Sequence, residues 1–161
     1  GVLAETNIYF DDTSNISVTG MKAKLRRVKN LGLVIIDYLQ LMQSDRKTEN
    51  RVQEVSDISR GLKLMAKEFE VPVITCAQLS RSSEKENKRP VLSDLRDSGA
   101  IEQDADTVMF LTRDYYKGDP EKENIADCII AKNRHGATGT ATLGWYGQFT
   151  KFITIDKEHE S

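Results

Sequence analysis

Hydrophobic residues recur with a helical period between Asn50 and Glu70, and this is the clearest periodic pattern in the chain. The apolar positions step by three or four residues and are Val52, Val55, Ile58, Leu62, Met65 and Phe69. This spacing places one apolar stripe along one face of a helix. Asn50 followed by Gln53 is a weak capping-box pattern, so we expect the helix to begin there. Residues 14–30 have a similar spacing with basic residues near the end, and they predict a second helix.

Short apolar runs predict strands on both sides of the long helix. Residues 33–37, 71–78 and 107–114 have the length and apolar content of buried strands, and residues 7–12 predict a further short strand. Residues 92–106 predict short helical turns between the runs at 71–78 and 107–114. Because strands alternate with helical segments, we predict an α/β fold with a parallel sheet core flanked by helices.

The C-terminal part has a different pattern. IADCIIAK, TATLGWY and FTKFITID are strand-like segments joined by glycine-containing turns, and they begin at residues 125, 140 and 149. Short turns between consecutive strands favour antiparallel pairing. We therefore expect C-terminal antiparallel hairpins that extend the sheet.

Composition limits the class of protein. The chain has 161 residues, 39% hydrophobic and 30% charged, as is typical of a globular domain. The net charge of −2 means that a nucleic-acid site would have to be local. No apolar run approaches the ~20 residues that span a bilayer, so no membrane partner is expected. Cys76 and Cys128 lie in apolar runs and are predicted to be reduced core residues of a cytosolic protein. The chain starts at Gly1 rather than methionine, which suggests a fragment of a longer protein.

Polar residues end each of the three predicted buried strands. Asp37 follows the first, Gln78 the second, and Arg113 with Asp114 the third. Ligands of open parallel sheets bind beyond the carboxyl ends of the strands. A carboxylate after an apolar run resembles a Walker B strand, where it faces Mg²⁺ and a nucleotide, but a helix cap or a hydrogen-bonded strand end would give the same pattern. The Gln78 amide can contact a γ-phosphate, or it can be a surface glutamine at a strand end.

Two cations follow the strand that begins at residue 125. Lys132 and Arg134 alternate, so they are expected to point the same way, and Gly136 and Gly139 predict a tight turn after them. Paired cations on a rigid turn suit a phosphate, and an arginine that reaches a neighbouring subunit's nucleotide would be an arginine finger. A solvated basic hairpin is the alternative interpretation.

Five segments, in this order, closely resemble the C-terminal motor domain of the DnaB-type replicative helicases. They are IIDYLQLM, ENRVQEVSDISRGLKLMAKEFEVPVI, AQLSR, KRPVLSDLRDSGAIEQDADTVMFLTRD and IIAKNRHGATGT. The resemblance implies that residues 1–161 form part of a RecA-like ATPase domain. It implies an ATP-dependent DNA helicase that uses ATP and Mg²⁺, translocates on single-stranded DNA and unwinds duplex at the replication fork. It also implies a homo-hexameric ring, helicase loader and primase partners, and a bacterial cytoplasmic location.

The same resemblance implies roles at the nucleotide site. Asp37 is similar to the Walker B aspartate and would be the Mg²⁺ residue, and Gln78 matches a glutamine that senses the γ-phosphate. Arg134 resembles the arginine finger that acts on the adjacent subunit, with Lys132 as its companion. Tyr115, beside Arg113, would stack on adenine, although tyrosines at a strand end also serve as packing residues. Trp145 is expected to be buried in the C-terminal hairpins rather than to serve as a platform for a nucleobase.

Two loops are implied to contact single-stranded DNA. Arg96, Asp97 and Gly99 match a central-channel loop that holds the DNA backbone, and an ordinary capped turn is the alternative. The preceding loop contains the basic residues Arg81, Lys85, Lys88 and Arg89. Acidic residues interleave with them, so a solvated loop explains this segment equally well.

One motif of the family does not occur in this sequence. No GxxxxGK[ST] phosphate-binding loop is found, so the chain carries less than half of an ATP site, and we expect the fragment to be inactive alone.

Two other hypotheses stay open. The chain could belong to another RecA-type ATPase, such as a recombinase or a phage primase-helicase. It could also be a non-catalytic half-domain that binds a loader or primase.

Overall fold

The computed structural model describes residues 5–46, 50–79, 89–113 and 122–155, with only the backbone at 96–98. The chain divides into two compact units, residues 1–77 and 78–161. The prediction that residues 1–161 form one partial ATPase domain stays a prediction. None of the helices in the described ranges is long and apolar enough to cross a membrane.

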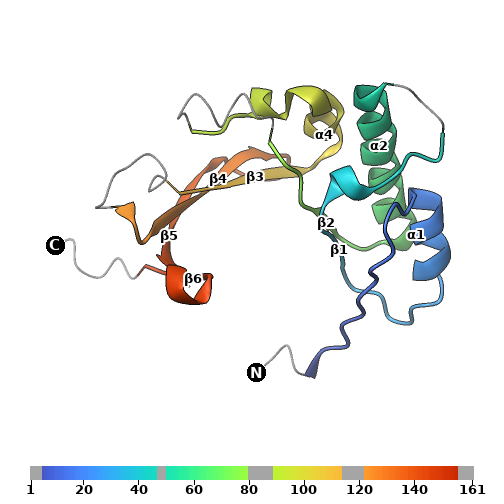
Figure 1. Ribbon diagram of the computed structural model, residues 1–161, viewed down its shortest axis with the longest axis horizontal. Helices are drawn as coiled ribbons and strands as arrows, with labels where there is room; N and C mark the ends of the chain where they lie inside the picture. The colour runs from blue at the N-terminus through green and yellow to red at the C-terminus, as the bar shows by residue number, and fades with distance from the viewer. Residues whose placement is uncertain (1–4, 47–49, 80–88, 114–121, 156–161) are drawn as a thin grey trace. The chain divides into compact units, whose positions relative to one another are not determined.

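The first unit is built on a pair of parallel strands. β1 (Val34–Ile36) pairs with β2 (Val73–Thr75), with Val34 opposite Val73 and Ile36 opposite Thr75. The chain between these strands contains the short 3-10 helix η2 (Leu39–Leu41) and the long helix α2 (Arg51–Phe69). Figure 1 shows α2 beside α1 (Val18–Leu25), with both helices next to the strand pair. This strand–helix–strand order confirms the predicted α/β class.

Helix α2 begins and ends within one residue of its predicted bounds. The Asn50 side chain accepts a hydrogen bond of 2.9 Å from the Val52 N–H and so caps the N-terminus. The helix ends because Glu70 has left-handed backbone angles and Val71 precedes Pro72, which favours extended backbone. The apolar stripe forms the centre of this unit's core, and its buried members are Val55, Ile58, Leu62 and Met65.

Truncating Ile58 is expected to destabilise the protein strongly. Ile58→Ala should lower the free energy of unfolding by about 2–5 kcal/mol, because the side chain is fully buried and leaves a cavity. Leu64→Ala on the same helix is the matched control, because Leu64 is 54% exposed, and it should cost less than about 1 kcal/mol. Urea denaturation of both variants measures the difference. Equal losses would contradict the assignment of the core face.

Helix α1 packs closely against α2. Its N-cap is Ser17, whose hydroxyl accepts a hydrogen bond of 3.2 Å from the Gly20 N–H. A Cβ atom on Gly61 of α2 would meet the Val18 side chain at 3.1 Å, so glycine permits the close approach. The helix is shorter than the predicted 14–30. The predicted strand at 7–12 is wrong, because these residues form no regular element, and apolar residues alone cannot form a strand without a pairing partner.

The second unit is an antiparallel sheet with two short helical segments before it. The strand order is β3–β4–β5–β6. The elements are η3 (Leu92–Ser98), α4 (Gly99–Asp104), β3 (Thr107–Thr112), β4 (Ile125–Asn133), β5 (Gly139–Tyr146), η6 (Gly147–Phe149) and β6 (Lys151–Thr154). Leu95, Val108 and Phe110 form its core cluster. The predicted C-terminal hairpins and the helical turns interrupted at Gly99 are confirmed. Contrary to the prediction, the hairpins do not extend the parallel pair but belong to a separate sheet.

Two predictions about the strands are wrong. Residues 107–112 pair antiparallel with β4, so the third predicted strand belongs to the second sheet and not to the parallel pair. The strands are also not buried on both faces, since Ile35 in β1 is 63% exposed while Val34 and Ile36 are buried. Cys76 is a free thiol as predicted, but it is exposed and not a core residue, because it follows the last residue of β2.

Candidate nucleotide and nucleic-acid site

Asp37 lies at the carboxyl end of the parallel strand pair. The pairing continues past the strands: the Cys76 N–H donates to the Ile36 carbonyl oxygen, and the Leu39 N–H donates to the Cys76 carbonyl oxygen, both at 2.9 Å. The backbone at Asp37 therefore lies between two hydrogen-bonded residues, Ile36 and Leu39. Its side chain is exposed, and the Asp37–Tyr38 peptide bond is cis. A carboxylate at the end of a strand can offer oxygen ligands to a hard cation.

Gln78 follows two residues after Cys76 and is exposed. It is the first residue of the second unit, whereas Asp37 belongs to the first. Its predicted role as a γ-phosphate sensor stays a prediction. Among the described residues, no group of three His, Cys, Asp or Glu side chains is arranged to hold a metal ion. This is compatible with Mg²⁺, which proteins commonly bind through one or two carboxylates together with substrate phosphates.

Lys132 and Arg134 point the same way, as predicted, and meet at the C-terminal end of α4. Lys132 Nζ donates to the Glu102 carbonyl oxygen and lies 3.4 Å from the Gln103 carbonyl oxygen. The Arg134 guanidinium lies 3.5 Å from the same Gln103 oxygen. It also forms an ion pair of 3.2 Å with Asp106. Asp106 was not predicted as a partner, because an acid just before an apolar strand is common and does not indicate which cation it meets.

The predicted DNA loops are only partly within the described residues. Arg81 and Lys88 lie outside them, and so do the side chains of Arg96 and Asp97. The backbone at 92–98 is the helix η3, and Gly99 is exposed at the start of α4. The Asp94 carboxylate accepts a hydrogen bond of 2.8 Å from the Val91 N–H, which fixes the start of η3.

Arg89 has a structural partner within the same unit. Its guanidinium forms an ion pair with Asp127, a buried residue of β4, and the Thr142 hydroxyl donates to the other Asp127 oxygen at 3.0 Å. A buried carboxylate without partners would be costly, so these contacts stabilise the charge. Arg89 therefore has a structural role as the partner of Asp127, and any contact that it makes with DNA would be additional to this pair.

Arg113 packs on the C-terminal hairpins. Its guanidinium lies 4.5 Å from the centre of the Trp145 ring, and it donates a hydrogen bond of 3.2 Å to the Glu123 carbonyl oxygen. Trp145 also packs against Phe152, with ring centres 4.9 Å apart, so it packs within the hairpins, although it is only partly buried. Tyr115 lies outside the described residues, and adenine stacking by this segment stays a prediction.

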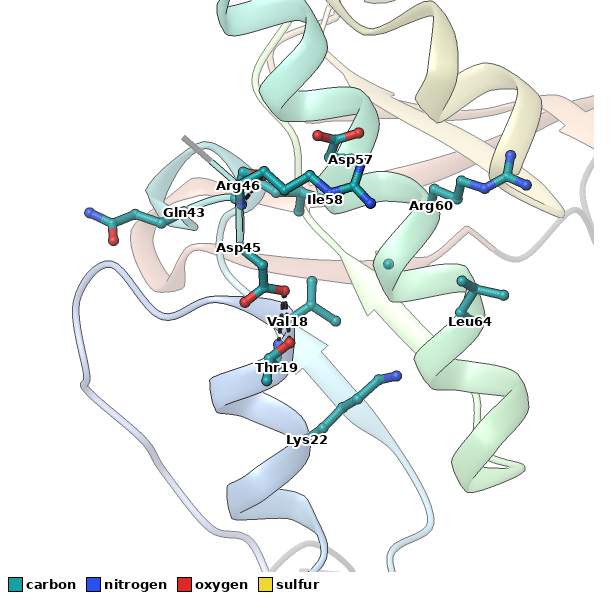
Figure 2. A pocket seen from close by; sticks show the side chains of 12 residues that line it. Val18, Thr19, Lys22, Gln43, Asp45, Arg46, Asp57, Ile58, Arg60 and Leu64 are labelled. Atoms are coloured by element: carbon teal, nitrogen blue, oxygen red, sulfur yellow. Dashed lines mark hydrogen bonds between the residues drawn. The ribbon is translucent and has the colours of Figure 1, made fainter. Parts of the chain in front are cut away.

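A separate cavity of about 370 Å³ lies between α1, α2 and the segment at 43–46. Figure 2 shows Thr19 and Lys22 on one side, and Asp57 and Arg60 on the other. Burial raises the pKa of the Asp45 carboxyl, but hydrogen bonds from Ser17 and Thr19 outweigh this and hold the pKa below its ordinary value. These bonds come from the backbone N–H and the hydroxyl of Thr19, in the first turn of α1, and from Ser17. The lining contains none of the residues predicted to bind nucleotide or DNA.

Comparison with known proteins identifies the family. The family model described as "DnaB-like helicase C terminal domain" matches residues 1–154. The chain is 52% identical to the replicative DNA helicase DnaB of Geobacillus stearothermophilus, across 99% of this chain and only 37% of that protein. It therefore spans little more than a third of the length of this relative.

Two solved structures share the fold. One is described as an ATPase domain; it is 43% identical with a TM-score of 0.89, and the match covers 96% of this chain and 57% of that one. A DnaB-like replicative helicase, described together with its interactions with primase, is 42% identical with a TM-score of 0.88, covering 96% and 39%. These matches confirm the predicted RecA-like class. The chain belongs to the family of DnaB-like helicase C-terminal domains.

Proposed function

We propose that this chain is part of the motor of an ATP-dependent replicative DNA helicase, which translocates on single-stranded DNA and unwinds the duplex at the replication fork. The observation that carries the proposal is the span of the family match, which includes Asp37, Gln78 and Arg134. Because the match continues through all three, it favours a helicase motor over another RecA-type ATPase. The relative named as a replicative helicase supports the same choice.

Within this motor, Asp37 is the residue that would hold Mg²⁺ beside ATP. Its exposed carboxylate at the end of β1 supplies the oxygen ligands that this cation prefers. A bound Mg²⁺ supplies neutralising charge to the phosphates when they are attacked. Gln78 would contact the γ-phosphate through its amide, which can both donate and accept hydrogen bonds. The phosphate-binding loop would come from the remainder of the full-length protein.

Arg134 would act on the nucleotide of the adjacent subunit in a homo-hexameric ring, with Lys132 beside it. Both side chains project from the end of β4, next to an exposed turn, and they lie together at α4. A guanidinium at this position can donate several hydrogen bonds to phosphate oxygens and offset the charge that develops during hydrolysis.

The segment Arg96–Gly99 would contact the single-stranded DNA backbone. Gly99 is exposed, and backbone N–H groups in such a turn can donate to phosphate without adding positive charge, which suits the net charge of −2. We further propose a helicase loader and primase as partners and the bacterial cytoplasm as the location. The interactions of the DnaB-like structural relative with primase support the primase partner.

A combined ATPase and unwinding assay tests the proposal. The full-length protein that carries this chain should hydrolyse ATP faster when a single-stranded oligonucleotide is added, and it should separate a forked duplex only with ATP and Mg²⁺. The 161-residue chain alone should neither bind ATP at micromolar concentration nor hydrolyse it, because its sequence has no phosphate-binding loop motif. A full-length protein whose ATPase ignores DNA, and which unwinds nothing, would refute the proposal.

A further inference from the structure

The cation pair of β4 is held in place by groups of its own chain. Two like charges on alternate residues repel each other, yet Lys132 and Arg134 both reach the Gln103 carbonyl oxygen. The C-terminal carbonyl groups of a helix carry partial negative charge, and Asp106 adds a full one. These groups offset the repulsion, so the pair is assembled without any contribution from a nucleotide.

The backbone fixes the same arrangement. The Arg134 N–H donates to the Asp106 carbonyl oxygen at 2.8 Å, and the strand register places Lys132 opposite Val108. Asp106 therefore contacts Arg134 twice, through its carbonyl group and through its carboxylate. With the backbone contact in place, the carboxylate contact selects the direction in which the guanidinium points.

The guanidinium can keep this contact while it binds another anion. The Arg134 side chain is 48% exposed and the Asp106 side chain 47%. A guanidinium has five N–H donors. One terminal nitrogen contacts Asp106 and the other contacts the Gln103 carbonyl oxygen, so further N–H donors are left for an anion. An exposed ion pair is also weak, so it orients the arginine without trapping it.

Helix α4 joins this cation pair to the segment proposed to contact DNA. Gly99 begins the helix directly after η3, and Gln103 lies near its other end. Six residues at the helical rise span only about 9 Å. Ile101 of this helix is buried. A shift of the backbone at Gly99 would therefore move the carbonyl groups that hold Lys132 and Arg134.

We infer that Asp106 is a positioning residue for Arg134, and that α4 transmits contact with single-stranded DNA at Gly99 to the cation pair. This inference rests on the proposed helicase function. Asp106 touches neither nucleotide nor DNA in this scheme. It keeps Arg134 attached to α4, so that ATP turnover at the adjacent subunit responds to DNA.

Asp106→Asn in the full-length protein tests the inference, because it removes the charge and keeps the size of the side chain. ATPase kcat and KM are measured without DNA and with saturating oligo-dT, and the affinity for oligo-dT is measured separately. We expect the DNA-stimulated kcat to fall about tenfold, as when a coupling residue is lost. The KM for ATP and the Kd for oligo-dT should both stay within about twofold of wild type, because Asp106 contacts neither ligand.

Two further variants distinguish a loss of Arg134 positioning from a general loss of folding. Asp106→Glu keeps the charge and should recover part of the stimulation. Asp57→Asn is the matched control on α2 and should behave like wild type. Among the described residues, Asp57 pairs only with Gln53. Unchanged stimulation in Asp106→Asn would overturn the inference. A parallel loss of DNA affinity, kcat and thermal stability, without recovery by glutamate, would overturn it too. A wild-type protein that DNA does not stimulate would instead refute the proposed function itself.

Discussion

Replacing Arg134 by alanine in the full-length protein is expected to lower its DNA-stimulated ATPase about a thousandfold or more, the effect typical of an arginine finger. The physical reason is charge. The γ-phosphate becomes more negative on its equatorial oxygens during transfer, and a guanidinium placed there offsets this in the transition state. Arg134 directly follows β4, and about half of its side chain is exposed, so it is available to an adjacent subunit.

Nucleotide binding separates this role from a structural one. A fluorescent ATP analogue should bind Arg134→Ala with nearly the wild-type Kd, because the arginine acts mainly in the transition state. Arg27→Ala is a suitable control, since Arg27 is another exposed arginine on the chain, and it should keep wild-type turnover. Full turnover by Arg134→Ala would show that the assignment is wrong.

Asp37→Asn is expected to lower ATP hydrolysis about a hundredfold or more. A carboxylate that holds Mg²⁺ contributes to a charge stabilisation worth several kcal/mol, and each ~1.4 kcal/mol corresponds to a factor of ten in rate. The amide keeps the shape of the side chain and removes its charge. Because Asp37 is exposed at a strand end, this change should leave the fold intact.

A magnesium titration of the ATPase rate measures this effect. The variant should need more Mg²⁺ for half-maximal rate, and it should stay slow at saturation. Its thermal unfolding temperature should match that of the wild type. Asp57→Asn again provides the control, because that carboxylate accepts a hydrogen bond from the Gln53 amide on α2 and is not predicted to bind metal. An Asp37→Asn protein with normal turnover and normal Mg²⁺ dependence would remove Asp37 from the metal site.

Local patterns predicted the long helix and the C-terminal hairpins, but they did not predict the partner of residues 107–112. The stripe of α2 predicted that helix to within one residue at each end, because burial on one face requires a helical period. A run of apolar residues carries no comparable information about strand partners. Residues 107–112 resemble a parallel core strand in sequence, yet they pair with β4, which lies later in the chain. Strand order depends on contacts that no local window contains.

In the candidate site, too, local geometry was predicted and a long-range contact was missed. The position of Asp37 at a strand end and the shared direction of Lys132 and Arg134 follow from strand geometry, so the sequence predicted them. The pair between Arg89 and Asp127 joins residues 38 positions apart and was missed. The signal was Asp127 itself, an acid within the apolar strand IADCIIAK, because a charge in such a place needs a partner. Asp106 carried no such signal.

Mixed rings test most directly the claim that Arg134 completes the site of a neighbouring subunit. Asp37→Asn and Arg134→Ala subunits would be purified separately, dissociated, mixed in equal amounts and reassembled, and the DNA-stimulated ATPase would then be measured. With random assembly, about one interface in four combines an intact Asp37 with an intact Arg134 from the next subunit. We expect the mixture to regain activity, up to about a quarter of wild type, although each variant alone is nearly inactive. A mixture no more active than the average of its two components would contradict it.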